Sequence, residues 1–319
     1  MEDKSTLTLQ TAIRGFLLHC TAENKSPRTV EWYESTLNSF QRWLRDQRAG
    51  GNGGSTLYLD QVAVEDVRGY LAWMKTPHLL HPAHKEKRPA KANTVRGHWA
   101  SLSAFFGWCV AEEFLRTNPV ARVKPPKVEV TEIDTLRRDE VKQILDACDT
   151  KRDKALICFM LDTLCRVREV TQLCCKHLEL ERGRAKVMGK GSRERYVYFG
   201  RATRKALWLY METERPEPLP GDDNDRVFLR HDGLPLNEKA LTKHIRKLGR
   251  RAGVPRLHAH LLRHTGAIER LRNGQDVFTL QRLLGHSTLE MVRRYLRALK
   301  NEDAENASRS TAPGDRWRL

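Results

Sequence analysis

The 319-residue sequence has no apolar run approaching the roughly 18 residues that a membrane-spanning helix needs. Its polar start, MEDKSTLTLQ, also lacks the apolar segment of a secretory signal peptide. These absences predict a protein that neither spans a membrane nor is secreted. The seven cysteines are an odd count and lie mostly within apolar stretches. We therefore expect buried, reduced thiols rather than a disulfide framework.

Signatures of metal-dependent and nucleotide-dependent chemistry are missing as well. His260 and His264 are spaced for one helix face, but no glutamate follows the first of them as in the metalloprotease motif. Residues 174–177 (CCKH) are a poor ligand set, because adjacent cysteines rarely both point at one metal. Lys190 is followed by glycine, where a phosphate-binding P-loop has serine or threonine. The sequence predicts no metal site and no phosphate-binding P-loop.

Positive charge is abundant and is spread along the whole chain. The sequence has 57 Lys and Arg against 40 Asp and Glu, a net charge of +17, and a pI near 9.8. Basic residues outnumber acidic ones by 18 to 13 in residues 1–130 and by 39 to 27 in residues 131–319. This balance indicates a polyanionic partner that contacts both halves.

The length suggests two domains, and proline marks a boundary between them. Residues 122–127 (RVKPPK) predict an extended, semi-rigid basic linker, because adjacent prolines cannot sit inside a helix. We expect four parts: a helical domain over 1–121, the linker over 122–130, a second domain over 131–300 and a polar tail over 301–319.

Apolar spacing predicts mainly helices in both halves. In the first, Ser26-Pro27 begins one helix, a shorter helix lies around Val62–Met74, and Asn93 caps another. In the second, a buried helix over Ala155–Leu164 precedes a hairpin with glycines at its tip. The expected strands are residues 186–188, 196–199 and, as a third, 227–229, and we expect helices beyond residue 237.

Several residues of the second half suit an anionic oxygen centre. Lys190, between two glycines, projects from a hairpin tip where the backbone can approach a ligand closely. His260 and Arg263 lie one helical turn apart, so an imidazole and a guanidinium share a face. Taken singly, a lysine at such a tip is most often a solvated surface residue. A histidine and an arginine spaced in this way are most often ordinary side chains of a helix.

Three further residues are ordinary by themselves. Gly285 predicts the end of one helix, with His286 between it and the next. Tyr295 lies on a short basic helix, where a tyrosine usually packs, and Arg166 follows a buried helix, where an arginine is usually a surface residue. Their meaning comes from their order along the chain.

In that order, these residues resemble the boxes of the tyrosine recombinase (phage integrase) family. The first box, T-G-L-R-x-S/G-E, corresponds to TLCRVRE at residues 163–169, and the box H-x-L-R-H-T corresponds to HLLRHT at residues 260–265. The strand lysine of GKG at residues 189–191 lies between them, and LGHS at residues 284–287 precedes Tyr295 at the family's spacing. The resemblance covers about residues 7–300, and all six expected reactive positions are filled.

The first box departs from the family pattern. Leu164-Cys165 stands where the family has Gly-Leu, and Arg168 stands where it has a small residue. We expect a bulky Leu164 to shift the turn that aims Arg166, and Arg168 to add a contact to a DNA phosphate.

The resemblance implies a mainly α fold. Its parts are a helical N-terminal core-binding domain and a mixed, mostly helical catalytic domain with a small antiparallel β-sheet. It implies a site-specific DNA recombinase that forms a 3′-phosphotyrosine without a metal ion, ATP or any other cofactor. The implied roles are Tyr295 as nucleophile, Lys190 as general acid, His260 as general base, and Arg166, Arg263 and His286 as groups that stabilise the phosphate.

The implied partner is double-stranded DNA with inverted-repeat target sites, which a homotetramer recombines on two paired sites. An accessory directionality factor is an optional further partner. No membrane partner is expected, and the expected location is the cytoplasm, with the nucleoid. Further DNA contacts are expected from basic side chains in both domains and the linker: Arg28, Lys91, Arg96, Arg122, Lys124, Lys127 and Arg168.

Other functions remain open at this point. A telomere resolvase or a strand-passing topoisomerase would use the same chemistry. A DNA-binding protein that keeps the fold without catalysis is motivated by the departures at Leu164, Cys165 and Arg168. A metal-dependent nuclease is the most distant alternative.

Overall fold

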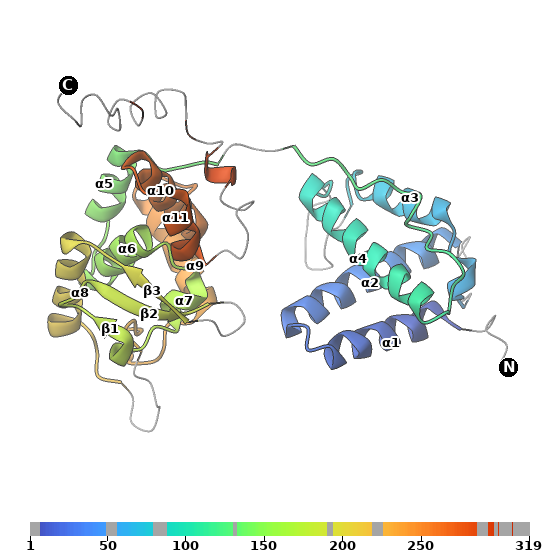
Figure 1. Cartoon of the computed structure of the whole chain (residues 1–319), viewed down its shortest axis with the longest axis horizontal. Coiled ribbons are helices and arrows are strands. Elements are labelled where there is room, and N and C mark those ends of the chain that lie inside the picture. Colours follow the sequence, from blue (N-terminus) through green and yellow to red (C-terminus); the bar gives the residue numbers. More distant parts are fainter. Residues whose placement is uncertain are drawn as a thin grey trace. The chain divides into compact units, whose positions relative to one another are not determined.

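A computed structural model of the chain describes residues 7–48, 56–78, 88–129, 133–189, 194–218, 226–285, 293–296, 299 and 308. The contacts divide the chain into two compact units, Met1–Val130 and Thr131–Leu319, and each is described by itself (Figure 1). Within the described ranges, no helix is both long enough and apolar enough to cross a bilayer.

The first unit is helical. Its helices are α1 (Leu9–Ala22), α2 (Pro27–Arg48), α3 (Val64–Trp73) and α4 (Ala92–Ala111), with a short 3-10 turn η2 (Leu59–Gln61). Ser26 Oγ accepts a hydrogen bond from Thr29 N at 3.3 Å, which confirms the expected start of α2. The expected cap of α4 is wrong: Lys91 is its N-cap and Asn93 lies within the helix, because Lys91 already has the extended backbone of a cap.

Aromatic rings fill the core of this unit. Phe16, Phe40, Tyr70, Phe105 and Phe106 are buried and contact one another mostly edge to face. Such contacts between helices bury large apolar areas with specific geometry.

The second unit combines seven helices with a small sheet in its described ranges. The helices are α5 (Arg138–Asp146), α6 (Lys151–Thr163), α7 (Val167–Thr171), α8 (Arg201–Thr213), α9 (Glu238–Arg251), α10 (Ala259–Arg272) and α11 (Val277–Leu284), with a 3-10 turn η3 (Cys175–His177). The antiparallel sheet has the order β1 (Leu178–Glu179), β2 (Arg184–Met188), β3 (Glu194–Tyr198).

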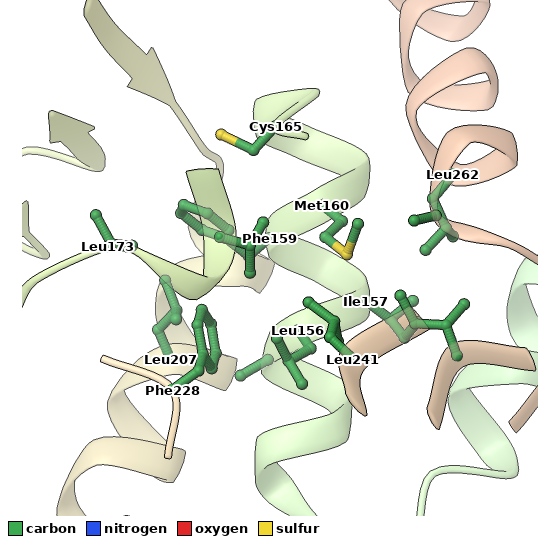
Figure 2. Close-up of a cluster of buried hydrophobic side chains, with 14 of the residues drawn as sticks. Leu156, Ile157, Phe159, Met160, Cys165, Leu173, Leu207, Phe228, Leu241 and Leu262 are labelled. Atoms are coloured by element: carbon green, nitrogen blue, oxygen red, sulfur yellow. The ribbon is translucent and has the colours of Figure 1, made fainter. Parts of the chain in front are cut away.

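Helix α6 runs through the core of the second unit and packs against α8 and α10. Figure 2 shows Leu156, Ile157, Phe159 and Met160 of α6 among buried side chains from its neighbours. Because α6 is buried on most of its surface, the turn that follows it is held in a defined place. All seven cysteines are free thiols, but only Cys20, Cys109, Cys148 and Cys165 are buried as expected. The other three, Cys158, Cys174 and Cys175, are partly exposed.

The expected third strand at residues 227–229 is wrong. The third strand is β1, which pairs with β2. Residues 226–229 make only isolated bridges, Cys174 with Arg226 and Leu229 with Pro235. Val227, Phe228 and Leu229 are all buried, so their apolar run reflects packing in the core rather than pairing along a sheet.

Candidate active site

Arg166 is the N-cap of α7 and follows directly after the turn that ends α6. Its backbone N–H donates to Glu169 Oε2 at 2.8 Å, and its guanidinium donates to Glu169 Oε1 at 3.3 Å. Glu169 is buried. Burial opposes its ionisation, but the hydrogen bonds and charges of Arg195 and then of Arg166 outweigh this and lower its pKa. The carboxylate therefore stays ionised and restrains Arg166.

Leu164 adopts the left-handed backbone conformation at the end of α6, with φ of 58°. Glycine adopts this conformation without strain, which is consistent with the glycine of the family's first box. The Leu164 carbonyl accepts a hydrogen bond from Arg263. Despite the leucine, Arg166 and Arg263 line the same cavity.

Arg263 lies on the inward face of α10 and is 3% exposed. Besides Leu164, its guanidinium donates to the carbonyl of Leu284 at 2.7 Å, so it joins the C-terminal ends of α6 and α11. Burial, followed by the charge of Arg166, lowers the pKa of Arg263 to about 10, which leaves the guanidinium charged at neutral pH.

Tyr295 is 4% exposed and packs beside α10 and α11. Its hydroxyl lies 3.0 Å from Nδ1 of His264. Burial raises the pKa of Tyr295 above its ordinary value of 10, although the charge and hydrogen bond of Arg263 act to lower it. The tyrosine is thus protonated at rest, beside a group that favours its ionised form.

His260 is exposed, and its ring centroid lies 6.3 Å from that of His264. Desolvation, followed by the charge of Arg263, lowers the pKa of His260. A cavity of about 210 Å³ brings these groups together and is lined by Ile133, Arg166, His260, Arg263, His264, Arg294 and Tyr295. Four of the six expected reactive residues therefore meet at one cavity.

The other two expected residues, Lys190 and His286, lie outside the described ranges. The neighbours of His286 agree with the prediction, since Gly285 is the left-handed C-cap of α11. In the part of the chain that is described, no group of three His, Cys, Asp or Glu side chains is placed to hold a metal ion.

Two residues near this cavity were missed by sequence reasoning. His264 contacts the tyrosine hydroxyl, whereas its four-residue spacing from His260 had suggested only a metal-ligand pair, which the motif did not support. Arg195 points inward from β3 and binds Glu169 at 2.7 and 2.8 Å. Its signal was available: Arg195 shares the inward strand face with buried Val197, where a charge needs a partner.

The expected DNA contacts outside this cavity are exposed side chains. Arg168 lies on α7, Arg28 on α2 and Arg96 on α4, and all three are exposed. Lys91 and the basic residues of the expected linker are exposed as well: Arg122, Lys124 and Lys127. Exposure makes them available to a phosphate backbone.

Comparison with known proteins identifies the family. Residues 134–302 match the phage integrase family, and residues 15–127 match the phage integrase SAM-like domain. The chain belongs to the phage integrase family. The members of this family are tyrosine recombinases, and the chain is accordingly a tyrosine-type site-specific DNA recombinase.

Individual relatives agree along most of the chain. The chain is 30% identical over 295 residues to tyrosine recombinase XerD of Bifidobacterium longum, covering 88% of this chain and 90% of that protein. It is 28% identical over 277 residues to tyrosine recombinase XerC of Lactobacillus delbrueckii subsp. bulgaricus, covering 85% and 88%.

Two solved structures share the fold of this recombinase. One is the Tn1549 transposon integrase in complex with a circular intermediate DNA, with a TM-score of 0.72, 17% identity and coverage of 96% of this chain and 100% of that one. The other is a lambda integrase dimer bound to a core site, with a TM-score of 0.68, 17% identity and coverage of 89% and 97%. These likenesses confirm the expected mainly α fold with a small antiparallel sheet.

Proposed function

We propose that this recombinase cuts and rejoins DNA through a covalent 3′-phosphotyrosine on Tyr295. One observation carries the proposal: a buried tyrosine, three arginines and two histidines line one cavity, although they come from segments far apart in the sequence. A tyrosine oxygen can hold a phosphodiester covalently, so the bond energy is kept for rejoining.

In the cleavage step, the Tyr295 oxygen attacks the scissile phosphorus and the bond to the 5′ oxygen breaks. Negative charge grows on the non-bridging oxygens, where Arg166 and Arg263 donate through planar, fixed guanidinium groups. His286 adds a third donor, and Lys190 protonates the leaving 5′ oxygen as general acid. In the assignment that follows the family resemblance, His260 assists as general base.

Because fixed cations take the place of a divalent metal, this mechanism requires neither a metal ion nor ATP. The arginines are held before DNA arrives: Arg166 by Glu169, and Arg263 by the carbonyls of Leu164 and Leu284. Such preorganisation lowers the reorganisation needed in the transition state.

DNA contacts from the first unit are proposed for the starts of α2 and α4. Trp32 of α2 lies 5.6 Å from His98 of α4 between ring centroids, so these helices are in contact near their N-terminal ends. Arg28 lies one turn before Trp32, and Arg96 lies two residues before His98. The exposed basic residues there supply charge to neutralise phosphates.

We propose that the substrate is duplex DNA with inverted-repeat sites and that a homotetramer recombines two paired sites. The reaction would integrate, excise or resolve a mobile element or replicon. An accessory directionality factor is an optional partner. The catalytically silent alternative keeps DNA binding but forms no covalent adduct, so adduct formation separates it from the enzyme.

The experiment mixes the full chain with fragmented DNA from its source and recovers SDS-resistant adducts. We expect adducts with the wild type, mapping to a short inverted repeat, and none with Tyr295→Phe, which should still bind DNA. An adduct that survives Tyr295→Phe would overturn the assignment of the nucleophile. Salt-sensitive binding without any adduct in either protein would favour the catalytically silent alternative.

A further inference from the structure

Arg195 is a charged side chain directed into the second unit. It lies on β3 opposite Val187 of β2, and 13% of its side chain is exposed. Nη1 and Nη2 donate to the two oxygens of Glu169 at 2.7 and 2.8 Å, and Nε donates to the carbonyl of Leu283 at 3.0 Å. Every nitrogen of this guanidinium therefore has a partner within the protein, which is the arrangement of a side chain that holds other groups in place.

Glu169 passes this restraint on to Arg166. Its Oε1 accepts from Nη1 of Arg166 at 3.3 Å, and its Oε2 accepts from the Arg166 backbone N–H at 2.8 Å. The Glu169 side chain is 3% exposed, whereas that of Arg166 is 35% exposed and lines the cavity with Tyr295. Because two-point pairing with Arg195 fixes the plane of the carboxylate, it also fixes the place where Arg166 is held.

The Arg195 guanidinium also packs against the end of α11, since strand β3 and α11 are in contact. Leu283 lies in the last turn of this helix, and Gly285 is its left-handed C-cap. A Cβ atom at Gly285 would lie 3.1 Å from Nη1 of Arg195. The glycine therefore allows the guanidinium to approach the helix end closely.

Both arginines that are proposed to stabilise the phosphate are thereby attached to this helix end. Arg263 donates directly to the carbonyl of Leu284 at 2.7 Å. Arg166 is connected to the same end through Glu169 and then Arg195. Two guanidinium groups that bind one phosphate must keep a fixed separation, so a common attachment serves the geometry of the site.

We propose that Arg195 is a positioning residue for DNA cleavage, which holds Glu169 against the end of α11 so that Arg166 is aimed at the scissile phosphate. The proposal rests on the proposed function, in which Tyr295 attacks this phosphate and Arg166 stabilises it. Arg195 acts through Arg166 and has no need to touch the DNA. Its effect therefore depends on the negative charge that grows on the non-bridging oxygens, because Arg166 stabilises that charge.

The test separates positioning from stability of the fold. Arg195→Lys keeps a positive charge beside Glu169, but a single ammonium nitrogen lacks the fixed fork that binds both carboxylate oxygens and the Leu283 carbonyl. Arg184→Lys is the matched control, because Arg184 pairs with Glu179 on the same sheet. The substrate is a synthetic duplex of the sequence recovered by adduct trapping. It carries either the ordinary phosphodiester or an uncharged methylphosphonate at the cleavage point, and adduct formation is followed in single turnovers.

We expect Arg195→Lys to bind the phosphodiester duplex like the wild type and to form the adduct about 10²-fold more slowly. On the methylphosphonate, where less negative charge needs an aimed guanidinium, most of this difference from the wild type should disappear. Arg184→Lys should match the wild type on both duplexes. An equal loss on both duplexes in Arg195→Lys, or a wild-type rate on the phosphodiester, would overturn the proposal.

Glu169→Gln is a second variant, in case lysine does not fit at position 195. It loosens the same connection from its other side, so it should show the same dependence on the substrate. A double-mutant cycle tests whether Arg195 acts through Arg166: once Arg166→Lys is present, Arg195→Lys should slow cleavage little further. Fully additive losses would overturn the proposal, as would a loss in Glu169→Gln that is equal on both duplexes.

Failure of the proposed function is recognised separately in the same experiment. In that case the wild type forms no adduct with the phosphodiester duplex, or Tyr295→Phe still forms one, and the positioning role is overturned with it. When the wild type forms the adduct and Tyr295→Phe does not, the comparison of the two duplexes decides the role of Arg195 alone. Urea unfolding of each variant shows that the chain is folded under the conditions of the assay.

Discussion

Arg195 and Glu169 form a two-point ion pair inside the second unit. Nη1 of Arg195 lies 2.7 Å from Oε1 of Glu169, and Nη2 lies 2.8 Å from Oε2. The same arginine donates through Nε to the carbonyl of Leu283 at 3.0 Å, and the same carboxylate holds Arg166. Strand β3, the first turn of α7 and the end of α11 are therefore joined through one guanidinium. All three segments lead directly to expected reactive residues.

Replacement of this arginine should destabilise the fold strongly. Arg195→Met leaves the buried Glu169 carboxylate without its main partner, and we expect a loss of about 3–5 kcal/mol in the free energy of unfolding in urea. Arg184→Met is the matched control, because Arg184 pairs with Glu179 at the surface of the same sheet. That variant should unfold close to the wild type. Equal losses in the two variants would contradict a special role for Arg195.

Acid should remove part of the stability that Glu169 provides. The pKa of Glu169 in the fold lies below its ordinary value of 4.5, because the partner arginines outweigh the effect of burial. Its contribution to stability is therefore complete above that value and is lost as pH falls through the lower folded pKa. We expect Glu169→Gln to melt below the wild type at neutral pH, with a gap that narrows as pH falls below 4.5. A melting-temperature series against pH measures this gap, and a constant gap would contradict the prediction.

Local patterns in the sequence were sufficient for most elements of the fold. Helical spacing predicted α6, and glycine predicted the C-cap at Gly285, which has φ of 62°. The hairpin strands were also found, because strand-forming residues on both sides of a glycine-rich tip are a short-range signal. The prediction of a third strand at Val227–Leu229 was wrong, because a short apolar run looks the same in the sequence whether it forms a buried loop or a strand.

The motif order predicted which residues would meet, but not how they touch. Arg166, His260, Arg263 and Tyr295 line one cavity as expected. The contact of His264 with Tyr295 spans 31 residues, and that of Arg195 with Glu169 spans 26. Such pairs depend on how whole elements pack, which no local spacing specifies.

At Leu164, a glycine substitution should leave the protein more stable than an alanine substitution, which is the reverse of the usual order in a helix. Its φ of 58° is strained for any residue with a Cβ atom, while its side chain is fully buried. Both Leu164→Gly and Leu164→Ala remove buried side-chain contacts, which should lower the free energy of unfolding by about 2–5 kcal/mol. The glycine variant also loses the strain, so we expect it to be more stable than the alanine variant by about 1 kcal/mol. Urea unfolding of the pair decides this, and the reverse order, as in an ordinary helix, would contradict it.

Arg28 and Arg96 should contribute to DNA affinity through phosphates rather than bases. Each neutralised phosphate releases counterions, so the salt dependence of binding counts such contacts. We expect Arg28→Ala and Arg96→Ala each to reduce the slope of log affinity against log salt by about 1, equally on the target fragment and on unrelated DNA. Arg68→Ala is the control in the same unit, because Arg68 of α3 is paired with Glu65 and is not expected to reach DNA. An unchanged slope, or a loss confined to the target fragment, would place these two arginines away from the DNA backbone.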